Sequence, residues 1–300
     1  MKKGLKWIGI ILGVLALIVV VAIFFLNSSA KNRLDKTYDV KPTALSVPKD
    51  SLSIARGKHL VEVMCVECHG PDLGGTAFFS EPSLGTINSA NLTRGKGGVA
   101  ASYKDEDWVR SIRHGINPQG KPLFIMPSKE LHNLSANDLG QVIAYLKSLP
   151  PMDREWSKPE LTTKARVILS LGGFGDIINA ETIDHAAGFV PEPVAGPTAA
   201  YGEYWVKAMG CRTCHGQDLN GGKDPNPKAP FSPNLTPGGP LGKWTAADFI
   251  KTMRTGTTPE GKALKAEFMQ WRALGRMTDD ELTALYAYLH SVPAKETAAQ

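Results

Sequence analysis

The chain has 300 residues, of which 42% are hydrophobic and 21% charged, so it has room for about two folded domains. Its net charge is +5, but three of its 34 basic residues lie in the first six positions, which hold no acid. The remainder carries 31 basic and 29 acidic side chains, a net charge of +2. This near-neutral balance argues against nucleic acid as a partner.

The N-terminus has the pattern of a membrane anchor. Lys2, Lys3 and Lys6 precede an apolar run from Trp7 to Leu26. Signal-peptide cores span about 7–15 residues, whereas a bilayer-crossing helix needs about 20, so the length predicts a retained anchor over residues 1–30, with a linker at 31–50. The lysines are expected inside and the rest of the chain outside. Ser28-Ser29-Ala30 resembles a cleavage site, so a removed signal is the alternative.

Two copies of Cys-x-x-Cys-His, at residues 65–69 and 211–215, use all four cysteines of the chain. The pattern is typical of covalent haem c attachment, because two thiols must reach the two vinyl groups of one porphyrin while the next residue turns its imidazole onto the iron. We therefore predict two covalently bound haem c groups, with the proximal iron ligands His69 and His215. Haem c is attached outside the bacterial cytoplasm, which agrees with an exported chain.

Three other interpretations of Cys-x-x-Cys remain: a zinc half-site, a redox-active dithiol and a structural disulfide. A four-thiolate zinc site would leave both histidines accidental. A thioredoxin-like dithiol is expected in a βαβ context, whereas glycine and proline crowd the residues after both motifs. The complete motif in two copies favours haem.

An internal repeat divides the exported part into two homologous domains. The run from Asn91-Leu92-Thr93 to Leu123 recurs from Asn234-Leu235-Thr236 to Leu264. Both halves also end with the triplet Ala-Tyr-Leu ahead of a proline. We expect a first domain at 51–151, a connector at 152–198, a second domain at 199–295 and a tail at 296–300. The Asn-Leu-Thr triplets match the glycosylation sequon in spelling, but their repetition fits a domain template better.

Caps and periodicity predict the same helices in both halves. Ser135 with Asp138, and Thr278 with Glu281, form capping-box pairs ahead of apolar stripes. In the connector, residues 166–183 are apolar enough to form an ordered segment, and residues 191–197 form a stiff proline-spaced linker. Strand signals are nearly absent, so the fold should be mainly α. The expected helices, in chain order, cover residues 54–63, 104–115, 135–149, 201–209, 245–256 and 278–292.

Each domain also needs a sixth iron ligand after its motif. In the first domain, Met126-Pro127 lies between the middle and last helices. Aligning the two final helices places Met269 on Met126, which predicts these two thioethers as ligands. Met277 is the alternative in the second domain, but it aligns with Leu134 and is expected to pack at the start of the last helix.

Histidines are the rival sixth ligands. His114 and His132 flank Met126, but neither recurs in the second domain, and His59, His185 and His290 have no ligand pattern. A thioether raises the potential of a haem relative to a second imidazole. A filled sixth position also disfavours small-molecule catalysis at the iron.

The sequence resembles class I c-type cytochromes throughout both domains, and is most similar to the cytochrome subunits of membrane-bound quinoprotein alcohol and sugar-acid dehydrogenases. The resemblance implies that Cys65, Cys68, His69 and Met126 hold one haem, and that Cys211, Cys214, His215 and Met269 hold the other. It also places Gly57 and Gly202 where the first and last helices of each domain cross. The closer match is carried by residues 85–87, 91–93, 105–108, 115, 126–127 and 134–146.

Two features depart from those subunits. They usually carry three haems, whereas this chain has two motifs, and Gln270 stands where the first domain has Pro127. The expected fold is an N-terminal transmembrane helix followed by two tandem class I cytochrome c domains.

The predicted function is a non-catalytic, membrane-anchored electron carrier on the periplasmic side of the bacterial inner membrane, exchanging single electrons with redox protein partners. One alternative is an electron-transfer subunit of a larger dehydrogenase, respiratory or photosynthetic complex. Another is a dihaem peroxidase, which would need one open haem.

Overall fold

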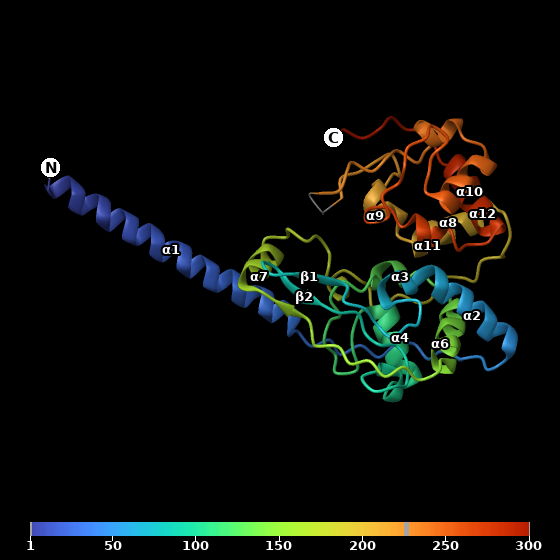
Figure 1. Ribbon diagram of the computed structural model, residues 1–300, viewed down its shortest axis with the longest axis horizontal. Coiled ribbons are helices and arrows are strands. Elements are labelled where there is room, and N and C mark those ends of the chain that lie inside the picture. The colour runs from blue at the N-terminus through green and yellow to red at the C-terminus, as the bar shows by residue number, and fades with distance from the viewer. Residues whose placement is uncertain (1, 225–227, 300) are drawn as a thin grey trace.

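The computed structural model describes residues 2–224 and 228–299, so residues 1 and 300, the ends of the expected anchor and tail, lie outside the description. Figure 1 shows a long helix, α1 (Lys2–Leu34), that leads into two mainly helical domains. The expected architecture of one N-terminal apolar helix followed by two tandem helical domains is confirmed.

The predicted helices are present in both domains, with ends within three residues of those expected. Within the described residues, each domain has five α-helices in the same order. The first contains α2 (Ser51–Met64), α3 (Val66–His69), α4 (Asp105–His114), α5 (Ser128–Leu131) and α6 (Ala136–Ser148). The second contains α8 (Ala199–Ala208), α9 (Cys211–His215), α10 (Ala246–Thr255), α11 (Trp271–Leu274) and α12 (Asp279–Ser291). Short 3-10 turns precede the middle helices at Val99–Ala101 and Pro240–Lys243.

The first and last helices of each domain cross at a glycine, as the resemblance implied. A Cβ atom on Gly57 would lie 1.9 Å from the carbonyl oxygen of Gln141 in α6. A Cβ atom on Gly202 would lie 1.9 Å from the carbonyl oxygen of Ala284 in α12. Both helix pairs therefore pack backbone to backbone, which no residue with a side chain permits without moving the helices apart.

The connector contributes structure that the sequence did not indicate. Strand β3 (Glu160–Leu161) pairs with β2 (Gly85–Ile87), which pairs with β1 (Phe79–Glu81), in a small antiparallel sheet of order β1-β2-β3. Strands of two or three residues are too short to show an alternating pattern, so periodicity could not reveal them. The sheet fastens the connector to the first domain.

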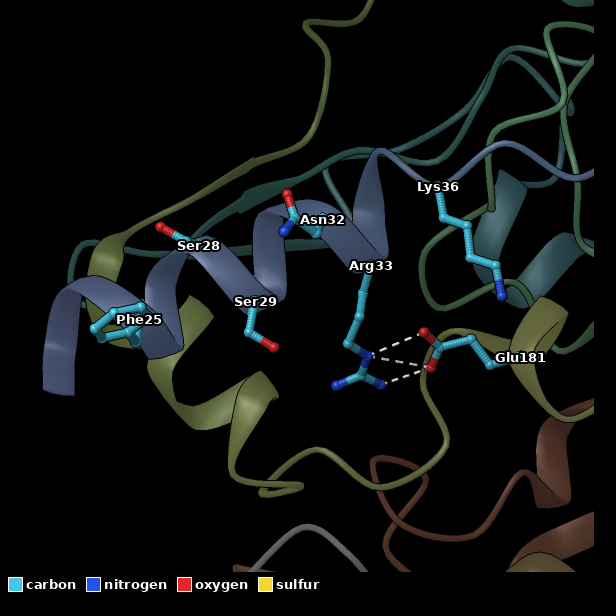
Figure 2. Close-up of a pocket in the computed structure, with 7 residues that line it drawn as sticks. All are labelled: Phe25, Ser28, Ser29, Asn32, Arg33, Lys36 and Glu181. Atoms are coloured by element: carbon cyan, nitrogen blue, oxygen red, sulfur yellow. Dashed lines mark hydrogen bonds and ion pairs between the residues drawn. The ribbon is translucent and has the colours of Figure 1, made fainter.

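Helix α7 (Thr163–Ser170) overlaps the connector segment expected to be ordered, and it packs against α1. Ala30 of α1 is fully buried against Leu169 and Ile178. Arg33 donates to both carboxylate oxygens of Glu181, which lies in the 3-10 turn Asn179–Glu181 (Figure 2). These contacts explain why α1 runs to Leu34, four residues into the segment expected to be a linker.

The two domains meet through a buried carboxylate at the start of each final helix. Glu281 is 2% exposed and accepts from Arg56 Nη1 at 2.7 Å, while His59 Nε2 lies 2.7 Å from its other oxygen. Asp138 occupies the equivalent position in the first domain and accepts from Tyr204 of α8 at 2.5 Å. Because α2 and α8 are equivalent helices, the interface is approximately self-complementary, like that between two copies of one subunit.

The same contacts correct one predicted capping box. Thr278 and Glu281 bond reciprocally as expected. The Ser135 hydroxyl accepts from the Asp138 amide, as expected. The Asp138 carboxylate, however, accepts from Tyr204 instead of from the Ser135 amide. The hydroxyl of Tyr204 accepts from that amide at 3.1 Å. The second domain therefore completes the helix cap of the first.

Substituting Gly57 by alanine should destabilise the first domain. The new methyl group would collide with backbone rather than with a movable side chain, and overpacking of this kind costs about 1–3 kcal/mol. Gly188→Ala is the matched control, because a Cβ atom there meets nothing within 4 Å. Denaturant titration should show a lower midpoint for Gly57→Ala alone, and equal midpoints would contradict the crossing.

Glu281 should make the stability of the chain depend on acid pH. Burial raises the pKa of Glu281, but hydrogen bonds from His59 and Arg56 outweigh it and bring the pKa to about 2. A carboxylate whose pKa is depressed on folding stabilises above its unfolded pKa of about 4.3, and this contribution is lost as pH falls toward the folded value.

Glu281→Gln should therefore lower the unfolding free energy at pH 6 by roughly 3 kcal/mol, and the difference from wild type should shrink toward pH 3. Asp280→Asn, an exposed change in the same helical turn, is the control. Denaturation at several pH values measures the difference, and a pH-independent gap would show that Glu281 is not held as a carboxylate.

Candidate haem-attachment sites

Both Cys-x-x-Cys-His motifs fold into a short helix directly after the first helix of their domain. Cys65 ends α2 and begins α3, and Cys211 opens α9. Each motif is followed by a glycine with positive φ, Gly70 at 82° and Gly216 at 80°, which turns the chain away from the site. None of the four cysteines is paired in a disulfide, so all four are available for thioether bonds to haem.

A backbone carbonyl orients the imidazole of each predicted proximal ligand. His69 Nδ1 lies 2.8 Å from the carbonyl oxygen of Ala90, and His215 Nδ1 lies 2.8 Å from that of Pro233. A carbonyl only accepts, so Nδ1 carries the hydrogen and Nε2 keeps its lone pair for a metal. Burial lowers the pKa of both imidazoles, which holds them neutral and ready to bind iron.

The repeated Asn-Leu-Thr triplets hold these carbonyls in place. Asn91 follows Ala90, and its side-chain oxygen accepts from both the amide and the hydroxyl of Thr93. Its amide group donates to the carbonyl of Met152, beyond the last helix. Asn234 makes the same bonds to Thr236 and Lys295. Both asparagines are 1% exposed, so the triplets serve the fold rather than glycosylation, as expected.

A cavity in the second domain brings the predicted ligands together. It has a volume of about 1290 Å³, and Cys211, Cys214, His215 and Met269 all line it. Its other walls are largely apolar, with Phe249, Leu264, Leu274 and Leu285 among them. Two thiols, a neutral imidazole and a thioether converging on an apolar cavity of this size fit a haem c group.

The structure places the two alternative methionines differently. Met277 is 1% exposed and packs in the hydrophobic core. Among the described residues that line the cavity, Met269 is present and Met277 is not. In the first domain, Met126 is partly buried against the same core, while its neighbours Ile125 and Pro127 line the cavity of the second domain.

Both motifs also take part in the domain interface, which the sequence did not reveal. Thr213, inside the second motif, donates to Glu130 of α5 at 2.9 Å. Glu67, inside the first motif, pairs with Arg276 at 2.7 Å. The variable residues of each Cys-x-x-Cys therefore bind the domain that carries the other motif.

The histidines outside the motifs serve structural contacts. Both ring nitrogens of His132 contact Arg113, and His114 Nδ1 lies 3.1 Å from His185 Nδ1. Burial, with the nearby His185, lowers the pKa of His114 to about 3, so it stays neutral. His59 contacts Glu281, and His290 Nδ1 lies 3.2 Å from the carbonyl of Tyr286.

The thiol environments disfavour the other interpretations of the motifs. Burial raises the pKa of Cys65 to about 12 and that of Cys211 to about 11, whereas a redox-active dithiol needs a lowered pKa. In the described part of the chain, no group of three or more His, Cys, Asp and Glu side chains is arranged to hold a metal ion. The two cysteine pairs lie in separate domains and do not form a four-thiolate zinc site.

Comparison with protein families matches each domain separately. The model described as cytochrome c oxidase, cbb3-type, subunit III matches residues 53–146, and the cytochrome c model matches residues 199–293. Each match contains one Cys-x-x-Cys-His motif. Together with a relative named as a dihaem protein, they confirm the two predicted haem c groups.

Three similar proteins cover both domains. The fructose dehydrogenase cytochrome subunit of Gluconobacter japonicus is 28% identical over 87% of this chain and 56% of its own length. The gluconate 2-dehydrogenase cytochrome c subunit of Pantoea cypripedii is 25% identical over 82% and 60%. A dihaem c-type cytochrome of Cereibacter sphaeroides is 24% identical over 77% and 83%. The chain thus spans little more than half the length of the dehydrogenase subunits it matches.

Replacing one cysteine should affect one haem only, because the motifs lie in separate domains. In Cys211→Ala, the second haem should lose one thioether bond while the first stays attached through Cys65 and Cys68. Mass spectrometry of tryptic peptides identifies which motif carries haem, with Cys65→Ala as the mirror control. Loss of both haems from the peptides of either variant would contradict independent attachment.

Proposed function

Because the chain is a c-type cytochrome with two haem domains, we propose that it carries single electrons between redox partners outside the cytoplasm. The observation that carries this proposal is the pair of equivalent attachment sites, each with two thiols and an oriented imidazole. When bound, haem supplies one-electron iron chemistry, while the protein sets its ligands, burial and surroundings. The interface at Glu281 and Asp138 fixes the two sites relative to each other.

We propose His69 with Met126, and His215 with Met269, as the axial ligands. Met269 lines the cavity together with His215, and Met126 stands at the equivalent point ahead of α5. Methionine opposite histidine fills the sixth position and favours ferrous iron relative to two imidazoles. A chain with both positions filled has no vacant coordination site for peroxide, so electron transfer is favoured over a peroxidase.

Met269→Ala should open the second haem to carbon monoxide, because alanine offers no sixth ligand. Met277→Ala is the matched control, because it removes a methionine from the hydrophobic core and leaves the proposed ligand Met269 in place.

 Met277 lies in the core and outside the cavity lining, so its removal should leave the haem closed to carbon monoxide. Difference absorption spectra of the reduced variants with carbon monoxide measure this. Carbon monoxide binding in Met277→Ala but not in Met269→Ala would reverse the assignment.

We further propose that α1 is retained as an anchor in the bacterial inner membrane, with both domains on the periplasmic side. By length and composition α1 can cross a membrane, since its most apolar window has a mean hydropathy of 3.3 and is not buried by the rest of the chain. Ala30, the last residue of the possible cleavage site, is fully buried inside the continuous helix. The folded chain thus uses residues on both sides of that site, which supports retention.

A dehydrogenase is the partner we propose on the donor side. The proposal rests on the relatives named as cytochrome subunits of fructose and gluconate dehydrogenases, which this chain matches across both domains. Membership of such a complex is the second candidate function. The similarity to a protein named only as a dihaem cytochrome favours a separate carrier.

Purification from membranes in mild detergent should separate these two functions. A complex subunit should co-purify with a stoichiometric dehydrogenase chain, and adding the substrate of that enzyme should reduce both haems. A separate carrier should purify alone and accept electrons from an added donor. Turnover of peroxide by the isolated protein would contradict both and favour the peroxidase.

A further inference from the structure

We propose that the turn after α7, residues 171–173, is a second membrane contact that lies in the phospholipid headgroup layer and holds the two haem domains against the bilayer. This inference rests on the proposed anchoring by α1. Its partner is a phospholipid surface, and four observations on the described residues carry it.

The first observation is the depth at which α7 is bonded to α1. Ser170 Oγ donates to the carbonyl oxygen of Leu26 at 2.6 Å, and Arg166 Nη1 donates to Asn27 Oδ1 at 3.3 Å. Leu26 ends the apolar run, whose roughly 20 residues rise about 30 Å, the thickness of the hydrocarbon core. When α1 spans the bilayer, the end of α7 therefore lies at the boundary of that core.

The second observation is that α7 is firmly held at this level. Leu169 and Ile178 bury Ala30 completely. Arg33 donates to the carbonyl oxygen of Leu169 at 2.9 Å and pairs with Glu181 at 2.7 Å. The segment therefore meets the last turns of α1 through apolar packing, hydrogen bonds from side chains and an ion pair together, and its height above the bilayer is fixed.

The third observation is the chemistry of the turn itself. The side chain of Leu171 is 68% exposed, and a Cβ atom on Gly172 would meet nothing within 4 Å. Phe24 and Phe25 of α1, each 65% exposed, belong to the same end of the apolar run. Leu171 directly follows Ser170, which is bonded to Leu26, so this exposed leucine lies at the same level as the exposed end of the apolar run, and lipid is the partner that covers both.

The fourth observation is the order of side chains along the end of α1 and the residues directly after it. Figure 2 shows Phe25 followed by Ser28, Ser29 and Asn32, and then by the cationic Arg33 and Lys36. The sequence of apolar, neutral polar and basic groups matches the order of hydrocarbon, interface and headgroup phosphate at a bilayer surface. These residues line a shallow pocket of about 470 Å³ beside Glu181.

The test uses the full-length holoprotein in nanodiscs of phosphatidylethanolamine and phosphatidylglycerol. The haems consume all four natural thiols, so a single introduced cysteine is the only one free to carry a benzophenone label. Leu171→Cys probes the turn, and Phe25→Cys probes the proposed anchor. Leu52→Cys is the control, because Leu52 is 81% exposed at the start of α2, on the far side of the first domain from α7 (Figure 1).

After illumination, intact-mass spectrometry should find phospholipid adducts at positions 25 and 171, several-fold above position 52. Adducts at position 25 but not at position 171 would contradict the second membrane contact and would still support anchoring by α1. Adducts at neither position would refute the anchor itself. Equal yields at 52 and 171, or an adduct of 171 with a protein chain, would also overturn the inference.

Discussion

The arrangement of the molecule depends on the buried carboxylate of Glu281. A charge with 2% exposure is costly unless it is paired, and its partners Arg56 and His59 come from the other domain. The carboxylate therefore stabilises the chain only when the two domains are docked. The equivalent acid, Asp138, accepts from Tyr204 of the second domain, so each domain supplies a buried acid and a donor for the other.

Docking has consequences at the haem sites because the same interface includes both attachment motifs. Thr213 and Glu67 bond to the opposite domain from within Cys-x-x-Cys, and the segment after Met126 forms part of the wall of the second cavity. The two sites are thus joined through one interface. In each, a carbonyl next to an Asn-Leu-Thr triplet orients the imidazole, which links a repeated sequence triplet to the orientation of a proposed iron ligand.

The helices and the haem-attachment motifs could be predicted from the sequence, because they are encoded by residues close together in the chain. Capping residues at 135, 245 and 278 indicated where helices begin. The spacing of Cys65, Cys68 and His69 indicated covalent haem attachment without any tertiary information. The crossing at Gly57 followed from resemblance rather than from spacing. Position in the repeat distinguished Met269 from Met277 as a candidate.

The remaining features depend on contacts between residues far apart in the chain, which no local pattern encodes. Examples are the bonds of Glu281 to α2, the pairing of β3 with β2, and the packing of α7 on α1. The carbonyl of Ala90, which contacts His69, is a backbone group, so no residue type in the sequence identifies it. Its position directly before the repeated Asn91 was the one available clue.

Intact-mass spectrometry of the protein purified from membranes tests the central claim most directly. The account predicts the mass of a polypeptide that keeps its N-terminal apolar helix and carries two haems that acidified acetone does not extract. A mass with one haem or none, or a chain that begins after Ala30, would contradict it.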